Sequence, residues 1–383
     1  MWSLSVTSSS RSPHDVEALS QFSPVSTPSS SPPQTPSQSE SSGKRRRRRR
    51  KRKHKHKPPL RLRATTHVDS LGFLVDSHLG CRYPDVDVPA ATVTGRIGKW
   101  LAMMESETPL REGKKTKSRA RKGIPKAVRG KAWKMLLAGK DDPEEAYAAA
   151  LEGGYPPDPD SVLVKDLHRT LPDHPVFAGK GGPGQAGLCR VLSAATYVRS
   201  EVGYCQGIGF VAAFLLLFMD EASAFASLVA LCDSGPDAVY GLGDLYAPGL
   251  PDIVPYCQTL QALLRMTDPE LADHMAEVGM EPEIYAMPWF MTLFASVLPA
   301  AYTVRILDVF FTEGRKILFR VALALIATVR AQALAADFGG LMGVLRASVY
   351  SPGVTPGELI DNALGVGITR AEVAELLARH RQT

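Results

Sequence analysis

The stretch GYCQGIGFVAAFLLLFM, Gly203–Met219, decides the fold class of this chain. Its apolar part runs from Ile208 to Met219, twelve residues without a charge. A bilayer-spanning helix needs about 20 apolar residues, so this run is too short to cross a membrane. The sequence therefore predicts a buried helix, which is entered through the glycine-flanked turn Gly203–Gly207.

Helical spacing of apolar residues recurs on both sides of this stretch. Apolar positions repeat at intervals of three and four residues. The predicted inward faces are Leu188, Val191, Leu192, Ala195 and Val198; Leu260, Leu263 and Leu264; and Val304, Leu307, Phe310 and Phe311 beside Arg305 and Asp308. Thr369 and Glu372 form a capping box before a last helix, with Val373, Leu376 and Leu377 inward. A strand is indicated only around residues 72–75, and no repeat of 20–50 residues is present, so we expect an all-α fold.

Composition limits the class of protein further. Of the 383 residues, 44% are hydrophobic, which is enough for a large core. Five cysteines occur without CxxC spacing, so neither a zinc ribbon nor a redox pair is indicated, and reduced thiols in the cytosol or nucleus are expected. These cysteines are Cys81, Cys189, Cys205, Cys232 and Cys257. The residues after Met1 do not resemble a signal peptide.

The first 57 residues have a composition of their own. Residues 1–43 are rich in Ser, Thr, Pro and Gln and include five Ser-Pro or Thr-Pro pairs, so we expect a disordered tail. Residues 44–57, KRRRRRRKRKHKHK, carry twelve Lys and Arg; without them 33 basic residues face 39 acidic ones. Such a tract suits an anionic-membrane tether, which we favour, a nuclear import signal, or a solvated spacer. Nucleic-acid binding is less expected, because no aromatic residues interleave for base stacking.

The usual catalytic motifs are absent from the sequence. GKGGPG at Gly179–Gly184 lacks the Lys-Ser/Thr ending of a phosphate-binding loop, and we interpret it as a flexible loop. Neither GxSxG nor HExxH occurs. His168 and His174 are isolated, and we expect capping or surface roles for them. No metal site, no cofactor site and no self-contained hydrolase are therefore expected.

Two polar clusters stand out in apolar surroundings. In LVKDLHRT, Leu163–Thr170, Asp166 and Arg169 are three residues apart and can pair at a helix end. In GYCQG, Gln206 begins the buried helix, between two glycines that permit a tight turn. Structural readings remain open for both clusters: a simple ion pair for Asp166 and Arg169, and a helix cap for Gln206.

Five ordered blocks of the chain resemble the TBC domain of Rab GTPase-activating proteins. They are KGIPKAVRGKAW (residues 122–133), Leu163-x-x-Asp166-x-x-Arg169, Tyr204-Cys205-Gln206, PWFMTLFASVLP (residues 288–299) and RILDVFFTEGRKILFRVAL (residues 305–323). The second block has Leu163 where the family motif usually has Ile. Residues 331–356 are poorly similar. The resemblance implies a single V-shaped, two-lobed helical domain, with a flanking segment at 64–121, a core at 122–330 and a C-terminal helical end at 331–383.

The resemblance also implies roles for individual residues. Arg169 would be an arginine finger and Gln206 a glutamine finger that orients the attacking water. Asp166 would hold the Arg169 loop and Tyr204 would support Gln206 by packing. Structural roles are implied for the opening motif, namely Gly123, Pro125, Arg129 and Trp133.

The function that this resemblance implies is activation of GTP hydrolysis on a Rab-type partner. That partner would carry its own GTP and Mg²⁺, so the chain would not be an enzyme in its own right. Vesicle trafficking and a cytoplasmic, peripheral membrane location would follow. A binding-only scaffold and a nuclear, nucleic-acid-associated protein remain as alternatives.

Overall fold

A computed structural model describes residues 66–69, 71–76, 89–113, 115–139, 141–235 and 238–382. All of them belong to one compact unit, Leu60–Thr383. The disordered tail predicted for residues 1–43 and the polybasic tract at 44–57 lie outside the described residues, as does Cys81, and the expectations for them stay predictions.

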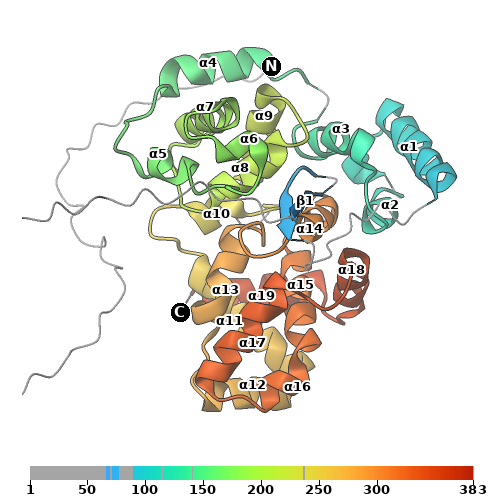
Figure 1. Ribbon diagram of the computed structural model, residues 1–383, viewed down its shortest axis with the longest axis vertical. Helices are drawn as coiled ribbons and strands as arrows, with labels where there is room; N and C mark the ends of the chain where they lie inside the picture. Colours follow the sequence, from blue (N-terminus) through green and yellow to red (C-terminus); the bar gives the residue numbers. More distant parts are fainter. Residues whose placement is uncertain are drawn as a thin grey trace, which may run out of the picture. The chain divides into compact units, whose positions relative to one another are not determined.

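The first half of the unit is a helical lobe with α7 among its central helices (Figure 1). Helix α7 contacts α4, α5, α6, α8 and α9. In chain order the elements are β1 (Thr66–Val68), β2 (Leu74–Asp76), α1 (Ala90–Glu105), the 3-10 helix η2 (Leu110–Glu112), α2 (Thr116–Arg121), α3 (Lys126–Leu137), α4 (Glu144–Gly154), α5 (Val162–Leu167), α6 (Pro175–Ala178), α7 (Pro183–Val198), α8 (Ile208–Leu216), α9 (Glu221–Leu231) and α10 (Leu242–Tyr246).

The second lobe is organised around α11 and α15 (Figure 1). Helix α11 contacts α12, α13, α15 and α19, and α15 contacts α13, α14, α17 and α18. The helices are α11 (Ile253–Thr267), α12 (Pro269–Glu277), α13 (Pro282–Met291), α14 (Ala300–Glu313), α15 (Lys316–Thr328), α16 (Arg330–Leu334), α17 (Phe338–Tyr350), α18 (Pro356–Gly365) and α19 (Arg370–His380). Residues 331–383, which include the poorly similar stretch 331–356, thus supply helices that complete this core.

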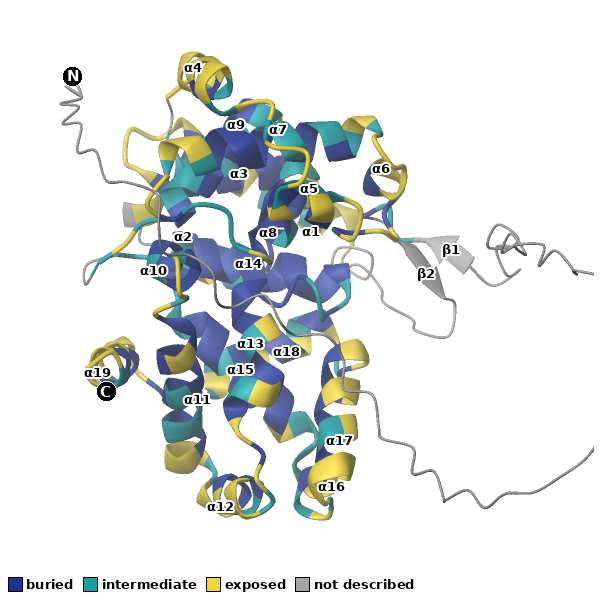
Figure 2. Cartoon of the chain, turned by 90° about the vertical axis from the view of Figure 1, so that its left-hand side faces the viewer, coloured by how far each residue is buried: buried dark blue, intermediate teal, exposed yellow. Residues whose placement is uncertain are grey.

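Helix α14 joins the two lobes. It contacts α2 and α3 on one side and α15 and α18 on the other, and Figure 2 shows it buried among its neighbours. The prediction of an all-α, two-lobed domain is confirmed. The predicted strand near residues 72–75 is observed as β2, which pairs antiparallel with β1 in the register Val68↔Leu74. Within the part that the structure describes, no helix is both long and apolar enough to span a bilayer.

The predicted helix faces are largely confirmed. The run from Ile208 forms α8, whose residues are nearly all buried. Helix α19 begins with the predicted capping box and buries Val373, Leu376 and Leu377. The inward position predicted for Val198 is wrong, because this residue lies at the end of α7 and is 44% exposed.

A second correction concerns α14. The sequence suggests a stripe on one face, but the helix is buried nearly all round, including Arg305 and Asp308. The charged groups are tolerated there because each has polar partners in the joint between the lobes.

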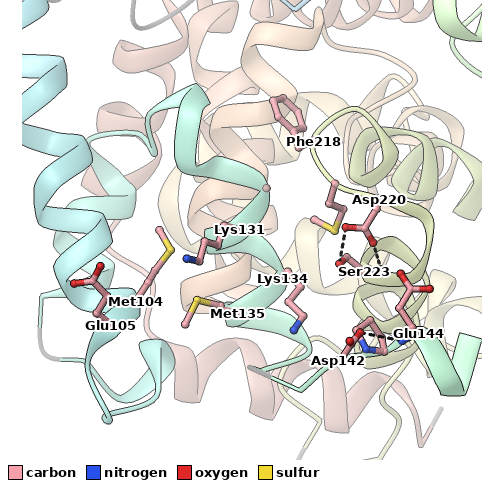
Figure 3. Close-up of a pocket in the computed structure, with 13 residues that line it drawn as sticks. Met104, Glu105, Lys131, Lys134, Met135, Asp142, Glu144, Phe218, Asp220 and Ser223 are labelled. Carbon is pink, nitrogen blue, oxygen red and sulfur yellow. Dashed lines mark hydrogen bonds between the residues drawn. The ribbon is translucent and has the colours of Figure 1, made fainter.

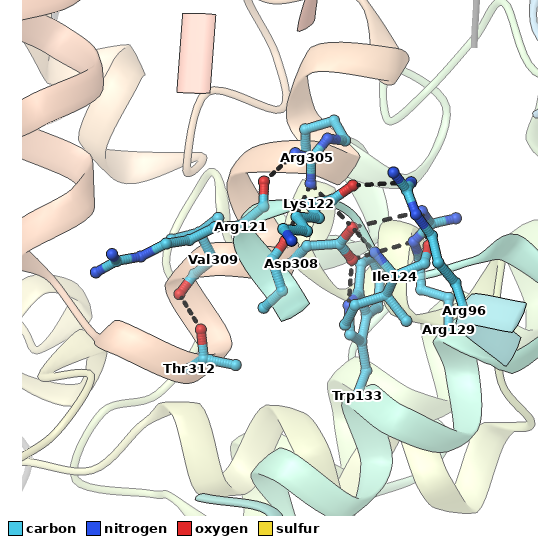
Figure 4. A network of polar contacts seen from close by, with 11 residues as sticks. Arg96, Arg121, Lys122, Ile124, Arg129, Trp133, Arg305, Asp308, Val309 and Thr312 are labelled. Carbon is cyan, nitrogen blue, oxygen red and sulfur yellow. Dashed lines mark hydrogen bonds and ion pairs between the residues drawn. The ribbon is translucent and has the colours of Figure 1, made fainter. Parts of the chain in front are cut away.

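Asp308 is the centre of this joint (Figure 4). Its Oδ1 accepts hydrogen bonds from Trp133 Nε1 at 2.9 Å and Arg129 Nε at 3.1 Å. Its Oδ2 accepts from the backbone N–H of Ile124 at 2.9 Å and lies 3.5 Å from Arg305 Nη1. The buried carboxylate of α14 is thus bound to α3 and to the turn before it, which fixes one lobe on the other.

Candidate functional site: a groove between the lobes with an arginine and a glutamine

Arg169 lies just beyond the end of the short helix α5. Asp166 Oδ1 accepts from Arg169 Nε at 2.8 Å, and Arg169 Nη2 lies 2.6 Å from the same oxygen. The Asp166 side chain is 9% exposed, whereas that of Arg169 is 45% exposed. The pairing suggested by the three-residue spacing is therefore present. It anchors one side of the guanidinium and leaves the rest open to solvent.

Backbone geometry ends the helix at this point. Thr170 Oγ1 donates to the Asp166 carbonyl at 2.9 Å, and Leu171 adopts φ +47°, a conformation that is uncommon for a residue with a side chain. The buried Thr170 and Leu171 fix the segment to the core. Arg169 is thus exposed on a short but well-anchored loop.

Tyr204 connects this loop to the second polar cluster. Its hydroxyl donates to Asp166 Oδ2 at 2.9 Å, so one carboxylate binds both Tyr204 and Arg169. Burial, and then the charge of Asp166, raise the pKa of Tyr204 well above its usual value, so the phenol keeps its proton at neutral pH and remains a donor. Tyr204, which we expect to support Gln206 by packing, thus also hydrogen-bonds the carboxylate that holds Arg169.

Gln206 occupies the tight turn before α8. Gly203 and Gly207 have φ of +67° and +114°, and a Cβ at Gly207 would lie 2.8 Å from the Met291 carbonyl oxygen, so both glycines are needed. The N-cap residue of α8 is Gly207, without a side-chain capping bond. The alternative of a helix-capping glutamine is therefore wrong. Gln206 is exposed, and its side chain makes no hydrogen bond to any described residue.

Arg169 and Gln206 line the same cavity, of about 810 Å³, between the lobes. The first lobe contributes the segment from Val202 to Gly207. The opposite wall consists of the segment 246–250 and of residues of α13 and the turn after it, among them Met287, Pro288 and Met291. The two polar groups therefore share one groove with a mainly apolar far wall.

That far wall is the part of the site that motif reasoning missed. Its signal in the sequence is the stretch PWFMTLF, residues 288–294, whose Pro288 lies inside α13. Leu293 and Phe294 then adopt φ of +49° and +66°, a sharp turn at the end of that helix. Tyr246 Oη donates to the Met291 carbonyl at 2.9 Å and ties α10 to this wall.

Cys205 stands between Tyr204 and Gln206 in the sequence but is unsuited to be a nucleophile. Burial, followed by the charge of Asp166, raises the pKa of its thiol to about 12. The thiolate is the reactive form, so at neutral pH this thiol is inert. The candidate functional groups of the groove are consequently the guanidinium of Arg169 and the carboxamide of Gln206.

The motif at residues 122–133 lies apart from the groove, in the joint between the lobes. Gly123 adopts φ +92° against the Arg305 guanidinium, and Pro125 is the N-cap of α3. Arg129 and Trp133 are fully buried and bind Asp308. Their neighbour Gly130 also has a packing reason, since a Cβ there would lie 1.8 Å from the Phe218 carbonyl oxygen.

A second cavity lies beside α3 and is lined by Met104, Lys131, Met135 and Phe218, among others (Figure 3). Two of its carboxylates have local structural roles. Asp220 Oδ1 accepts from the Ser223 backbone at 2.7 Å as the N-cap of α9, and Asp142 accepts from the Glu144 backbone at 3.2 Å. The residues predicted to act as fingers, Arg169 and Gln206, do not line this cavity.

The remaining candidates have structural explanations. The predicted flexible loop at Gly179–Gly184 is shorter than expected, because Pro183 begins α7. Buried Gln185 holds its turn by accepting from the Gly181 backbone at 3.0 Å and donating to the Phe177 carbonyl at 2.8 Å. His174 caps α6 as predicted, and burial lowers its pKa; His168 is an exposed residue at the end of α5.

The fold and groove define a largely helical protein that presents an arginine and a glutamine to one interlobe cavity. The family model of the Rab-GTPase-TBC domain matches residues 126–334. The chain belongs to this family.

Relatives and a solved structure agree with this assignment. TBC1 domain family member 10B of Homo sapiens is 39% identical over 272 residues, which covers 70% of this chain and 32% of that protein. Rab GTPase-activating protein tbc-11 of Caenorhabditis elegans is 35% identical over 233 residues, 59% of this chain and 24% of the relative. The crystal structure of the Chlamydomonas flagellar RabGAP TBC domain superposes with a TM-score of 0.64 at 25% identity, covering 78% of this chain and 98% of that one. This chain thus spans about a quarter to a third of these two relatives' length.

Proposed function

We propose that this chain is a GTPase-activating protein for a Rab-type small GTPase and that it supplies Arg169 and Gln206 to the partner's GTP site. The GTP and Mg²⁺ belong to the partner, and the chain contributes only side chains. Control of vesicle trafficking is the cellular role that follows from such an activity.

The observation that carries the proposal is the shared groove. Arg169 and Gln206 come from different loops, yet they line one cavity and are linked through the Asp166–Tyr204 hydrogen bond. An isolated structural ion pair would not require an exposed glutamine beside it. Two tight turns that present two exposed polar groups to the same space support a joint role.

The chemistry of the two groups fits phosphoryl transfer. Catalysis of this reaction depends on neutralising charge on the phosphate oxygens and on placing the attacking water. The guanidinium of Arg169 offers forked donors for the phosphate oxygens. The carboxamide of Gln206 can accept from water and donate to a phosphate oxygen at once. The apolar far wall, with Met287 and Met291, would help to exclude bulk water, which strengthens these electrostatic contacts.

The position of Asp166 gives the arginine a fixed direction. With one edge of the guanidinium bound to Asp166, little side-chain entropy is lost when the free edge meets a phosphate. The names of related proteins point the same way, since one relative is called a Rab GTPase-activating protein.

Single-turnover GTP hydrolysis measured over a panel of Rab proteins tests the proposal. We expect acceleration of at least one Rab, and a loss of roughly 10³-fold or more for Arg169→Ala. Arg169→Lys should lose most of the acceleration too, because lysine keeps the charge but not the fork. Arg265→Lys is the matched control, since Arg265 is 57% exposed and pairs with exposed Asp273 on the second lobe.

The outcomes separate the proposal from its rivals. Rab binding without acceleration on any member of the panel would indicate a binding-only scaffold. Near-wild-type acceleration by Arg169→Lys would contradict the arginine-finger role.

A further inference from the structure

A third cavity, of about 690 Å³, lies between α1 and the C-terminal end of α2 and is strongly basic. Five cationic side chains line it, and no carboxylate does so among the described residues. The cations are Arg96, Lys99, Lys115, Arg119 and Lys122. From residue 90 to residue 122 the sequence has nine Lys and Arg against three Glu. This basic segment is separate from the tract at residues 44–57.

The two arginines of the cavity are held in place by reciprocal hydrogen bonds. Arg96 of α1 donates from Nη1 to the Lys122 carbonyl at 3.2 Å, a contact visible in Figure 4. Arg119 of α2 donates from Nη1 to the Lys99 carbonyl at 2.7 Å. Each helix thus fixes an arginine of the other, and both guanidinium groups are half-buried.

The positive charges of Arg96 and Arg119 are not neutralised by a carboxylate among the described residues. Their hydrogen-bond acceptors are neutral backbone carbonyls, and no described carboxylate forms an ion pair with any of the five cations. Each guanidinium uses one N–H group for its anchor and retains others for a ligand. By contrast, neighbouring Arg121 is neutralised by Glu313 at 2.5 Å.

The shape of the cavity suits a compact ligand. Its floor includes buried Trp100, and Gly95 adds no side chain that would fill the space. The exposed lysines Lys99, Lys115 and Lys122 surround the half-buried arginines. Guanidinium groups with forked donors, surrounded by ammonium groups, are suited to bind phosphate monoesters. Because the cavity has five cations, a ligand that carries more than one phosphate group matches its charge best.

We propose that the α1–α2 cavity binds a multiply phosphorylated headgroup, of the kind carried by phosphorylated inositols. No residue lines both this cavity and the groove of Arg169 and Gln206. Figure 1 shows α1 and α2 on the other side of the unit from α5. The two sites can therefore be occupied together, and a headgroup embedded in a membrane would hold the domain at the surface where the groove acts.

The test compares the full chain with a triple variant, Lys99→Gln, Lys115→Gln and Lys122→Gln. These side chains are exposed and make no hydrogen bond to a described residue, so the fold should persist. Lys117→Gln is the matched control: it removes the same charge from an exposed position on α2 that does not line the cavity.

Inositol hexakisphosphate is the soluble probe, with the melting temperature and hydrogen–deuterium exchange as readouts. A ligand of the folded cavity raises the melting temperature, whereas a ligand that binds residues 44–57 equally in the folded and unfolded chain does not. We expect stabilisation and slower exchange in residues 90–122 for the wild type and for Lys117→Gln. The triple variant should bind about a hundredfold more weakly, at roughly fivefold for each lysine.

An equal response of the triple variant, or no response of the wild type, would overturn the proposal. A melting-temperature rise with duplex DNA but not with the inositol phosphate would also overturn it, in favour of a nucleic-acid contact. Cosedimentation with phosphatidylcholine vesicles, with and without phosphatidylinositol bisphosphate, then identifies the source of the headgroup. Lysine-dependent binding to the vesicles that contain phosphatidylinositol bisphosphate indicates a lipid, and binding of the soluble probe alone indicates a free polyphosphate.

Discussion

The hydrogen bond between Tyr204 and Asp166 allows the positioning of Arg169 to be tested without touching either finger. Tyr204→Phe removes one oxygen atom and retains the ring. The lost bond, 2.9 Å long and partly buried, is donated to a carboxylate. Hydrogen bonds to charged groups contribute about 1.5–3 kcal/mol. Asp166 would still accept from Arg169 Nε at 2.8 Å, so the ion pair persists but loses one of its two restraints.

The expected result is partial loss of activation. If losing the hydrogen bond raises the activation free energy of GTP hydrolysis by about 1.4 kcal/mol through poorer positioning of Arg169, the rate falls about tenfold. This rate is the one measured at a saturating concentration of the Tyr204→Phe variant. Affinity for the GTPase should change little, because Tyr204 is only partly exposed beside the groove. Single-turnover hydrolysis at several concentrations of the variant separates the two quantities.

Tyr197→Phe is the control for this substitution. Tyr197 lies on α7 with 55% of its surface exposed and makes no hydrogen bond to a described residue, so its variant should match the wild type. A Tyr204→Phe variant with wild-type rate and wild-type affinity would refute the positioning role. A variant that loses affinity but keeps its saturated rate would place Tyr204 in partner binding instead.

Two further predictions concern the fold and the tail. Asp308→Asn should lower the free energy of unfolding by about 3–5 kcal/mol in urea titrations, because it leaves buried Arg129 and Arg305 without their carboxylate. The control Asp273→Asn, at an exposed ion pair, should change this free energy little. Equal effects of the two substitutions would contradict the joint described for α14. Deletion of residues 1–57 should leave activation in solution nearly unchanged but alter the location of the protein in cells, and a collapse of soluble activity in a folded deletion variant would show that the tail belongs to the site.

Local sequence patterns predicted the parts of the fold and site that depend on near neighbours. The three-residue spacing of Asp166 and Arg169 gave their pairing, and the glycines around Gln206 gave its turn. The apolar run from Ile208 gave the buried helix. Each of these features depends on periodicity or backbone freedom within a few residues.

Features that depend on distant contacts could not be predicted in this way. Tyr204 and Asp166 are 38 residues apart, and Arg129 and Asp308 are 179 apart, so their hydrogen bonds exist only once the helices pack. The exposure of Val198 at the end of α7 likewise depends on how the helices pack and not on local spacing. The far wall of the groove, from Pro288 onward, was recognisable as a block of sequence but not as part of the site.

The most direct test of the two-finger account uses a partner Rab whose own switch glutamine is mutated. In the one-finger scheme the GTPase's glutamine orients the water, so this mutant should not respond. If Gln206 takes over that task, the wild-type chain accelerates hydrolysis by the mutant Rab, and Gln206→Ala abolishes acceleration of both Rab forms while its melting temperature stays close to that of the wild type. A mutant Rab that fails to respond, together with a folded and fully active Gln206→Ala chain, would contradict the account.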